Sequence, residues 1–319
     1  MRVLIIGLNG LIGPSIAHHA SAHGHIVFGM GRSANSNSIS DAFYVSGNRS
    51  DPKQILHTTI EHKIDVVVDV IPMVIGDTQP LLDCLDGVID QYVMISSSDV
   101  YANYELLHRR ATGDPILKAV DEDSPLRSTR HPYREKQPRL PSAPDQYLDD
   151  YDKIPIEHAT RKLSSAWTIL RLPMVYGPGD KQKRFRWAIA CMLRGNDTLV
   201  VPRGWANWQS TYGYVENVGA AVAITLGHQQ ARNQVFNIAE ETVASQLEWA
   251  RKFANTAAWR GAIELTDDPN DSFAQRLSGL NLNVPFKIDG TRLRQTFGFS
   301  DVIDGTTALV RTIESEAVP

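Results

Sequence analysis

The sequence predicts an α/β fold in which a doubly wound parallel sheet is covered by helices on both faces. Short apolar runs bounded by turn residues recur along the chain, with amphipathic stretches between them. Strands that are buried on both faces form continuous apolar runs, and the stretches between them are long enough for right-handed helical crossovers. A glycine-rich turn also separates the first apolar run from the first amphipathic stretch.

The elements follow from this alternation in order along the chain. Expected strands are residues 3–6, 25–30, 65–71, 91–96 and 167–172. Expected helices are residues 12–23, 52–62, 79–85 and 154–163. Residues 104–146 are rich in proline and arginine, which blocks regular structure, so we expect either an exposed surface loop or a lid that closes over a ligand.

Composition excludes several classes of protein. The 319-residue chain carries a formal net charge of -4, which offers no broad basic field, so we expect no nucleic-acid or membrane partner. No apolar run is long enough to cross a bilayer. The two cysteines, Cys84 and Cys191, are far apart and suggest neither a disulfide framework nor a metal site, so we expect no bound metal and a cytoplasmic location.

A glycine loop between the first strand and the first helix predicts a dinucleotide site. Gly7 permits the tight turn, Gly10 lets the backbone approach a pyrophosphate, and Gly13 allows close packing of the helix. The amides at the start of the helix then face the anion. The residues expected to contact the cofactor here are Gly7, Asn9, Gly10, Leu11, Ile12 and Gly13.

The end of the second strand indicates which nicotinamide cofactor is preferred. Folds specific for NAD place an acidic residue there, on the ribose hydroxyls. This chain has Arg32 and Ser33 instead, and both side chains can donate charge-assisted or neutral hydrogen bonds to a 2′-phosphate. The sequence therefore favours NADP over NAD, although a solvated surface arginine remains the other interpretation of Arg32.

Six short motifs, in order, resemble the extended short-chain dehydrogenase/reductases, the NAD(P)-dependent epimerase/dehydratase family typified by UDP-galactose 4-epimerase. They accompany the glycine loop and cover nearly the whole chain: ISSSDVY (95–101), DEDSPL (121–126), LRLPMVYGPGD (170–180), YVENV (214–218), VFNI (235–238) and TRLRQTFGF (291–299). The resemblance implies a Rossmann-type sheet with a smaller C-terminal substrate-binding domain. It divides the chain into residues 1–174, with about 212–238 returning, and residues 175–211 with 239–319. It also implies a homodimer.

The resemblance implies roles for particular residues. Ser97, four residues before Tyr101, would hydrogen-bond the reacting oxygen, with Ser98 as the fallback and a plain strand-ending role as the alternative. Asn48 occupies the position that contacts adenine. The further cofactor contacts that it implies are Arg49, Val70, Ile71, Pro72, Pro173 and Val175.

The family's Tyr-x-x-x-Lys motif is incomplete in this chain. The resemblance places Lys153 in the lysine position, where the ammonium would bind the nicotinamide ribose and lower the pKa of the tyrosine, but Asp149 stands where the tyrosine belongs. Tyr151 could supply the phenol if the helix containing Pro155 begins near residue 152, whereas on an unbroken helix it would point roughly 200° away from Lys153. Otherwise Asp149 is itself the acid or base, or another group is used, and a helix-start role for Asp149 stays open.

A second departure concerns the substrate. Nucleotide-sugar enzymes of the family hold the diphosphate with an arginine where this chain has Ser210. Several arginines could replace that arginine, and three tryptophans could stack on a ring, although surface charge and core packing are the simpler interpretations. The residues concerned are Arg184, Arg186, Arg203, Trp187, Trp205 and Trp208, together with the arginines of the proline-rich segment, Arg127, Arg130, Arg134 and Arg139.

Together these observations predict an NADP-preferring epimerase, dehydratase or reductase that acts by hydride transfer on a hydroxyl or carbonyl of a small polar, sugar-like molecule. Ser97, Lys153 and either Tyr151 or Asp149 would carry the chemistry. Two alternatives remain: a cofactor-binding protein without redox chemistry, such as a sensor, scaffold or nucleic-acid-associated protein, and a lyase or isomerase that uses the same pocket.

Overall fold

The computed structural model describes residues 1–32, 41–134 and 148–317. Its centre is a seven-stranded sheet in the order β11-β6-β5-β4-β1-β2-β3, in which every neighbouring pair is parallel. The strands are β1 (Arg2–Ile6), β2 (Ile26–Gly31), β3 (Phe43–Ser46), β4 (Val66–Asp69), β5 (Gln91–Ser97), β6 (Ala166–Leu172) and β11 (Gln234–Asn237). The predicted fold class, a doubly wound parallel sheet, is confirmed.

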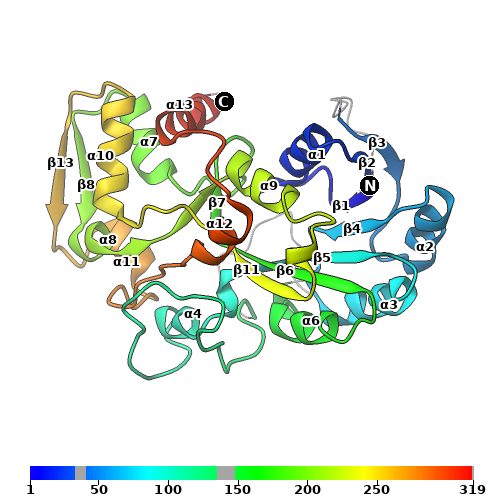
Figure 1. The fold of residues 1–319 in the computed structure, drawn as a ribbon. Coiled ribbons are helices and arrows are strands. Elements are labelled where there is room, and N and C mark those ends of the chain that lie inside the picture. The colour runs from blue at the N-terminus through cyan, green and yellow to red at the C-terminus, as the bar shows by residue number, and fades with distance from the viewer. Residues whose placement is uncertain (33–40, 135–147, 318–319) are drawn as a thin grey trace.

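The helices cover both faces of this sheet (Figure 1). On one face lie α1 (Gly13–Ala22) and α9 (Val215–Ala223), and on the other α2 (Pro52–Glu61), α3 (Ile75–Leu85) and α6 (Lys153–Thr160). The alternation of side chains along β1 explains the two layers. Val3 and Ile5 join the core under α1 and α9, whereas Leu4 and Ile6 join the core under α2, α3 and α6.

Every expected strand and helix is observed, and one helix has different bounds, but two strands of the central sheet, β3 and β11, were not expected. The helix expected at 79–85 begins earlier, at Ile75, and carries Pro80 inside it. β3 was not expected, because this four-residue edge strand has no buried residue and so lacks the apolar run of a central strand. Both strand and helix ends otherwise lie within a few residues of the prediction.

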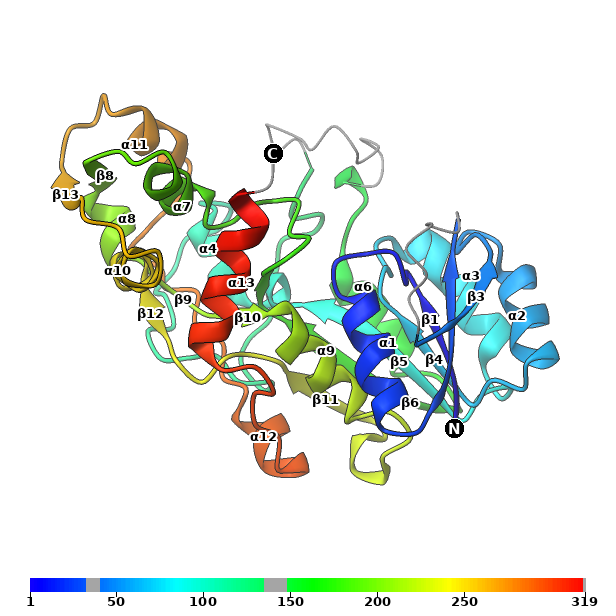
Figure 2. The ribbon, with the colours of Figure 1, turned by 90° about the horizontal axis from the view of Figure 1, so that it is seen from above.

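Most of the second half of the chain packs beside the sheet as a smaller mixed unit (Figures 1 and 2). It contains α7 (Arg186–Leu193), α8 (Arg203–Asn207), α10 (Gln246–Thr256), α11 (Ser272–Leu277) and α13 (Gly305–Ala317), with the parallel pair β8 (Thr198–Pro202) and β13 (Ala262–Thr266). Two short strand pairs lie between this unit and the sheet: β7 (Met174–Tyr176) with β10 (Tyr212–Tyr214), and β9 (Gln209–Ser210) with β12 (Ala244–Ser245). The helices α4 (Ala102–Leu107) and α12 (Thr291–Phe297) also pack in this region. The predicted domain boundaries stay a prediction.

A buried polar network joins segments that are far apart in the sequence. Arg171 on β6 donates to both carboxylate oxygens of Glu157 on α6, and also to the Tyr101 hydroxyl. The Tyr101 hydroxyl donates to Asn237, whose backbone amide donates to Glu122. Four of the six quoted motifs therefore meet at one place, and their polar residues hold the sheet's carboxyl edge together.

Within the described residues, no helix is both long and apolar enough to span a bilayer.

Candidate functional site

The candidate site lies at the carboxyl ends of β1, β4 and β5, where open parallel sheets bind ligands. The glycine loop follows β1, residues 70–72 follow β4, and Ser97 ends β5. Because these strands are neighbours in the sheet, the three segments meet at one edge.

The glycine loop is too tightly packed for larger residues. Gly7 has φ +98, and a Cβ there would lie 3.2 Å from Cβ of Val70 and 3.4 Å from Cγ2 of Ile71. A Cβ on Gly13 would lie 2.5 Å from two carbonyl oxygens, those of Gly7 and Leu8. The loop therefore brings bare backbone to the start of α1, and Gly7 lies directly against Val70 and Ile71, two of the residues predicted to line the cofactor.

A cavity of about 830 Å³ opens beside this loop. Asn9, Gly10, Leu11 and the first turn of α1 line one side, and residues 178–182 with Arg184 line the other. The amides of the first turn of α1 carry no side-chain cap, so they remain available to an anion. The volume is typical of small-molecule and cofactor sites, and the backbone cradle fits a dinucleotide pyrophosphate.

Side chains at the predicted adenine-binding end of the site make hydrogen bonds within the protein. Arg49 is buried and donates to both carboxylate oxygens of Asp69 and to the hydroxyl of Thr78. The Arg49 guanidinium, which was expected to contact the cofactor, is therefore already engaged in a buried ion pair. Asn48 is exposed, and its side chain accepts a hydrogen bond from the backbone amide of Ser50. Arg32 is exposed at the end of β2, and Ser33 lies outside the described residues.

Lys153 lies under the centre of the site. It is the first residue of α6, only 4% of its surface is exposed, and its ammonium donates to the carbonyls of Pro72 and Ile95. Burial lowers the pKa of Lys153 to about 8, while the charges of Asp69 and Asp99 oppose that shift. An ammonium has three hydrogens, so one remains for a ligand.

Tyr151 lies close to Lys153 and Ser97. The Lys153 ammonium is 5.6 Å from the centre of the Tyr151 ring, and the buried Tyr151 hydroxyl donates to Oδ2 of Asp99 at 2.8 Å. The Ser97 hydroxyl accepts from the backbone amide of Asp99 at 3.2 Å. Burial, followed by the charge and hydrogen bond of Asp99, raises the pKa of Tyr151 well above its ordinary value, and the neighbouring Ser97 hydroxyl acts in the opposite direction.

The start of α6 explains how Tyr151 reaches this position. Asp152 has extended backbone, with φ -163 and ψ 113, and its carboxylate caps the helix by accepting from the amide of Ile154. The helix therefore begins at Lys153, as the position of Pro155 predicts, and Tyr151 precedes regular helical geometry. Asp149 is half-buried, and its backbone carbonyl accepts from the Arg134 side chain.

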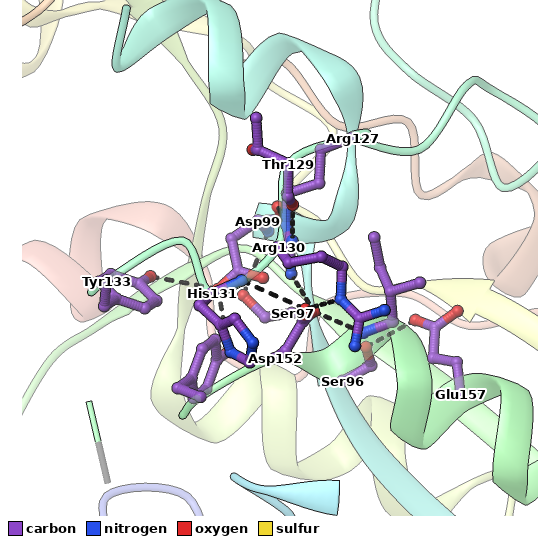
Figure 3. A network of polar contacts seen from close by, with 12 residues as sticks. Ser96, Ser97, Asp99, Arg127, Thr129, Arg130, His131, Tyr133, Asp152 and Glu157 are labelled. Atoms are coloured by element: carbon purple, nitrogen blue, oxygen red, sulfur yellow. Dashed lines mark hydrogen bonds and ion pairs between the residues drawn. The ribbon is translucent and has the colours of Figure 1, made fainter. Parts of the chain in front are cut away.

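Asp152 also binds the segment 127–134 through several polar contacts (Figure 3). Its two carboxylate oxygens accept from Arg127, which is buried, and from Arg130, and the backbone amide of His131 donates to it as well. Glu105 also holds this segment, because its carboxylate accepts from the backbone amides of Ser128 and Thr129. Arg127, Arg130 and Arg134 of the proline-rich segment therefore make hydrogen bonds within the protein. Arg139 lies outside the described residues.

The sequence interpretation missed Asp99 and Tyr133. Both tyrosines, Tyr133 at 3.1 Å and Tyr151 at 2.8 Å, donate to the same oxygen of Asp99. Asp99 is 2% exposed, and its other oxygen, Oδ1, is buried without a hydrogen-bond partner among the described residues. The one available signal was that Asp99 lies inside the motif that contains Ser97.

The substrate side has no free arginine at the expected position. Ser210 is fully buried and accepts from the Gln246 side chain, so nothing at this position can clamp a diphosphate. Arg184, Arg186 and Arg203 pair with Asp180, Glu316 and Asp267, respectively. Trp187, Trp205 and Trp208 pack against one another and Phe273. Core packing therefore accounts for the tryptophans, and internal ion pairs account for the arginines.

Pro173 and Val175, the residues expected beside the nicotinamide, are both buried next to β10. Val175 pairs with Gly213 in the parallel ladder, and its carbonyl accepts from Arg184. A Cβ on Gly213 would lie 3.0 Å from the Pro173 ring, so the two segments are in close contact.

Solved structures share this fold across their whole length. The chain superimposes on UDP-glucose 4-epimerase from Thermotoga maritima with a TM-score of 0.68 and 15% identity, covering 99% of this chain and 98% of the other. For dTDP-glucose 4,6-dehydratase from Bacillus anthracis in complex with NAD, the TM-score is 0.69 with 17% identity over 99% and 96% of the two chains. The chain therefore has the Rossmann-type fold of these epimerase and dehydratase structures.

Sequence comparison adds one curated relative. The chloroplast stem-loop binding protein of 41 kDa b from Arabidopsis thaliana is 22% identical over 254 residues, which is 75% of this chain. The match spans 59% of the length of that relative. No family model matches the chain.

Proposed function

We propose that the protein is an NAD(P)-dependent epimerase, dehydratase or reductase that acts on a hydroxyl or carbonyl group of a small polar, sugar-like molecule. The observation that carries this proposal is the approach of Tyr151 to Lys153 and Ser97 at the end of β5. A phenol, an ammonium and a hydroxyl are the groups that proton transfer at an alcohol or carbonyl carbon requires. They lie at the edge of the sheet that also carries the glycine loop.

The cofactor would lie along that edge. The glycine loop and the first turn of α1 would hold the pyrophosphate, the third hydrogen of the Lys153 ammonium would bind the ribose, and Val70 and Ile71 would line the site. A bound nicotinamide supplies hydride transfer. NADP is the preferred cofactor in this proposal because Arg32 is exposed at the end of β2 and no acidic residue adjoins it in the sequence.

The protein groups would handle protons and position. Ser97 would donate a hydrogen bond to the reacting oxygen, and Tyr151 would exchange a proton with it. Lys153 would hold its ligand without leaving the two carbonyls that anchor it. The segment 127–134, fastened through Asp152, would limit the access of water to Tyr151.

Two measurements test the proposal. Saturable binding of NADPH, tighter than that of NADH, is expected when the purified protein is titrated with each nucleotide and its fluorescence is followed. Incubation with nucleotide sugars and simple keto sugars then separates the reaction types, because a reductase consumes the reduced-nicotinamide absorbance and an epimerase leaves it unchanged. Absence of binding to both nucleotides would refute the proposal.

A binding role without redox chemistry is the second candidate, and the name of the Arabidopsis relative favours testing it with RNA. The net charge of -4 argues against strong RNA binding. Titration with a labelled stem-loop RNA at two salt concentrations decides, because a specific complex weakens with salt but still prefers the stem-loop over a single strand. A cytoplasmic location and a homodimer stay predictions.

A further inference from the structure

The buried carboxylate of Asp99 governs the phenol of Tyr151 more directly than Lys153 does. The Tyr151 hydroxyl donates its one hydrogen to Oδ2 of Asp99 at 2.8 Å. The Lys153 ammonium is directed instead at the carbonyls of Pro72 and Ile95, at 2.7 Å and 3.0 Å. An anion that accepts the phenol hydrogen stabilises the neutral phenol, whereas a cation beside the phenol oxygen would stabilise the phenolate.

The other contacts of the Asp99 carboxylate support the same interpretation. Tyr133, whose ring packs against that of Tyr151, donates a second hydrogen bond to Oδ2 at 3.1 Å. Oδ1 is buried and has no hydrogen-bond partner among the described residues. A buried carboxylate with one empty oxygen is costly for folding alone, and such groups are common where proton transfer takes place.

Resting on the proposed function of this site, we propose that Asp99 is a positioning residue that holds Tyr151 as a neutral phenol and receives its proton during the reaction. A hydroxyl on a bound substrate donates to the Tyr151 oxygen. As that O–H bond breaks, a new O–H bond forms on Tyr151, and the original phenol proton moves to Oδ2 of Asp99. The electron pair of the broken bond stays on the substrate oxygen, so this step moves protons only.

Charged and titratable groups from several elements face Asp99. Tyr104, Tyr133 and Tyr151 surround it, Arg127 donates to its backbone carbonyl, and Lys153 lies behind it. Burial and the charge of Asp99 raise the pKa of each of the three tyrosines. The Lys153 ammonium donates to the carbonyls of Pro72 and Ile95, and the Arg127 guanidinium donates to the carbonyl of Asp99 and to Asp152.

The test is the ionisation of Tyr151 itself, followed without cofactor or substrate. Protein labelled with ¹³C at the ζ carbon of tyrosine is titrated by NMR, and Tyr151→Phe identifies the resonance. In the wild type we expect Tyr151 to remain a phenol up to at least the ordinary tyrosine pKa of about 10. In Asp99→Asn the Tyr151 resonance should titrate at clearly lower pH, because the anion that stabilises the neutral phenol is removed. Tyr133→Phe keeps the carboxylate, so there Tyr151 should stay neutral.

Two results would overturn the proposal: ionisation of Tyr151 near neutral pH in the wild type, or an unchanged Tyr151 titration in Asp99→Asn. The first does not need Asp99→Asn, so it decides even if that variant fails to fold. Once a turnover assay exists, loss of the proton acceptor should lower kcat by about 100-fold or more and leave the nucleotide Kd unchanged. A protein that binds no nicotinamide nucleotide would refute the proposed function without changing the tyrosine titration.

Discussion

The guanidinium of Arg171 and the carboxylate of Glu157 meet in two hydrogen bonds, of 3.0 Å and 2.7 Å, with about 1% of either side chain exposed. Ser96 donates a third hydrogen bond to the same carboxylate. This pair links β6 to α6, the helix that begins with Lys153.

Replacing Arg171 with methionine should destabilise the protein strongly. The change leaves Glu157 buried without its counter-charge, and breaking such a pair costs about 3–5 kcal/mol. Chemical denaturation measures the free energy of unfolding. The control is Arg186→Met, which breaks an ion pair with Glu316 in which the arginine is 46% exposed, and should cost less than about 1 kcal/mol. Equal losses in the two variants would contradict the prediction.

Substituting Gly13 by alanine should impair folding and nucleotide binding together. The new Cβ would lie 2.5 Å from two backbone carbonyl oxygens, neither of which can move like a flexible side chain. Gly76 is the matched control, because it lies in the first turn of α3 and a Cβ there meets nothing within 4 Å. We expect a lower Tm and lost NADPH binding for Gly13→Ala, and wild-type values for Gly76→Ala. The loop would be looser than described if Gly13→Ala behaved like its control.

Removing the side chain of Arg32 should change cofactor preference. If this exposed arginine holds a 2′-phosphate, Arg32→Ala loses charge-assisted hydrogen bonds worth about 1.5–3 kcal/mol, so the Kd for NADPH rises about 10-fold or more. The Kd for NADH should stay the same. Arg260→Ala removes another exposed arginine, far along the chain, and controls for net charge. A parallel loss for both nucleotides would show that Arg32 does not read the phosphate.

The carboxyl group of Glu240 should make stability depend on pH. Burial raises its pKa from the ordinary 4.5 to about 7, although Tyr176 and the amide of Tyr214 bind the charged form. Between these two pKa values the folded state binds more protons than the unfolded state, so stability falls as pH rises from 4.5 towards 7. Glu240→Gln should flatten this slope in Tm and melt at a higher temperature than the wild type above pH 7. An identical slope of Tm against pH in the variant would show that another group causes the pH dependence.

The sequence predicted the central strands because β1, β4, β5 and β6 are short apolar runs, and it predicted the glycine loop from spacing. It did not predict β3, whose residues have no buried side chain. The choice between Asp149 and Tyr151 could not be made either. That choice depends on where α6 begins, and Asp152 sets this start while it is held by Arg127 and Arg130, which are more than twenty residues earlier in the chain.

The same long-range pairing explains why charged residues were hard to interpret. Arg49, Arg127 and Arg203 look alike in sequence, yet each has its own internal acceptor, namely Asp69, Asp152 and Asp267. The neighbouring residues in the sequence do not distinguish an arginine that forms an internal ion pair from one that can bind a ligand phosphate.

The double use of Asp152 has an evolutionary consequence. One carboxylate both starts the helix behind Tyr151 and fastens the 127–134 segment, so neither can be adjusted alone. Homologous chains that alter this segment to admit a different molecule should therefore change at residues 149–152 as well, and the two stretches should covary.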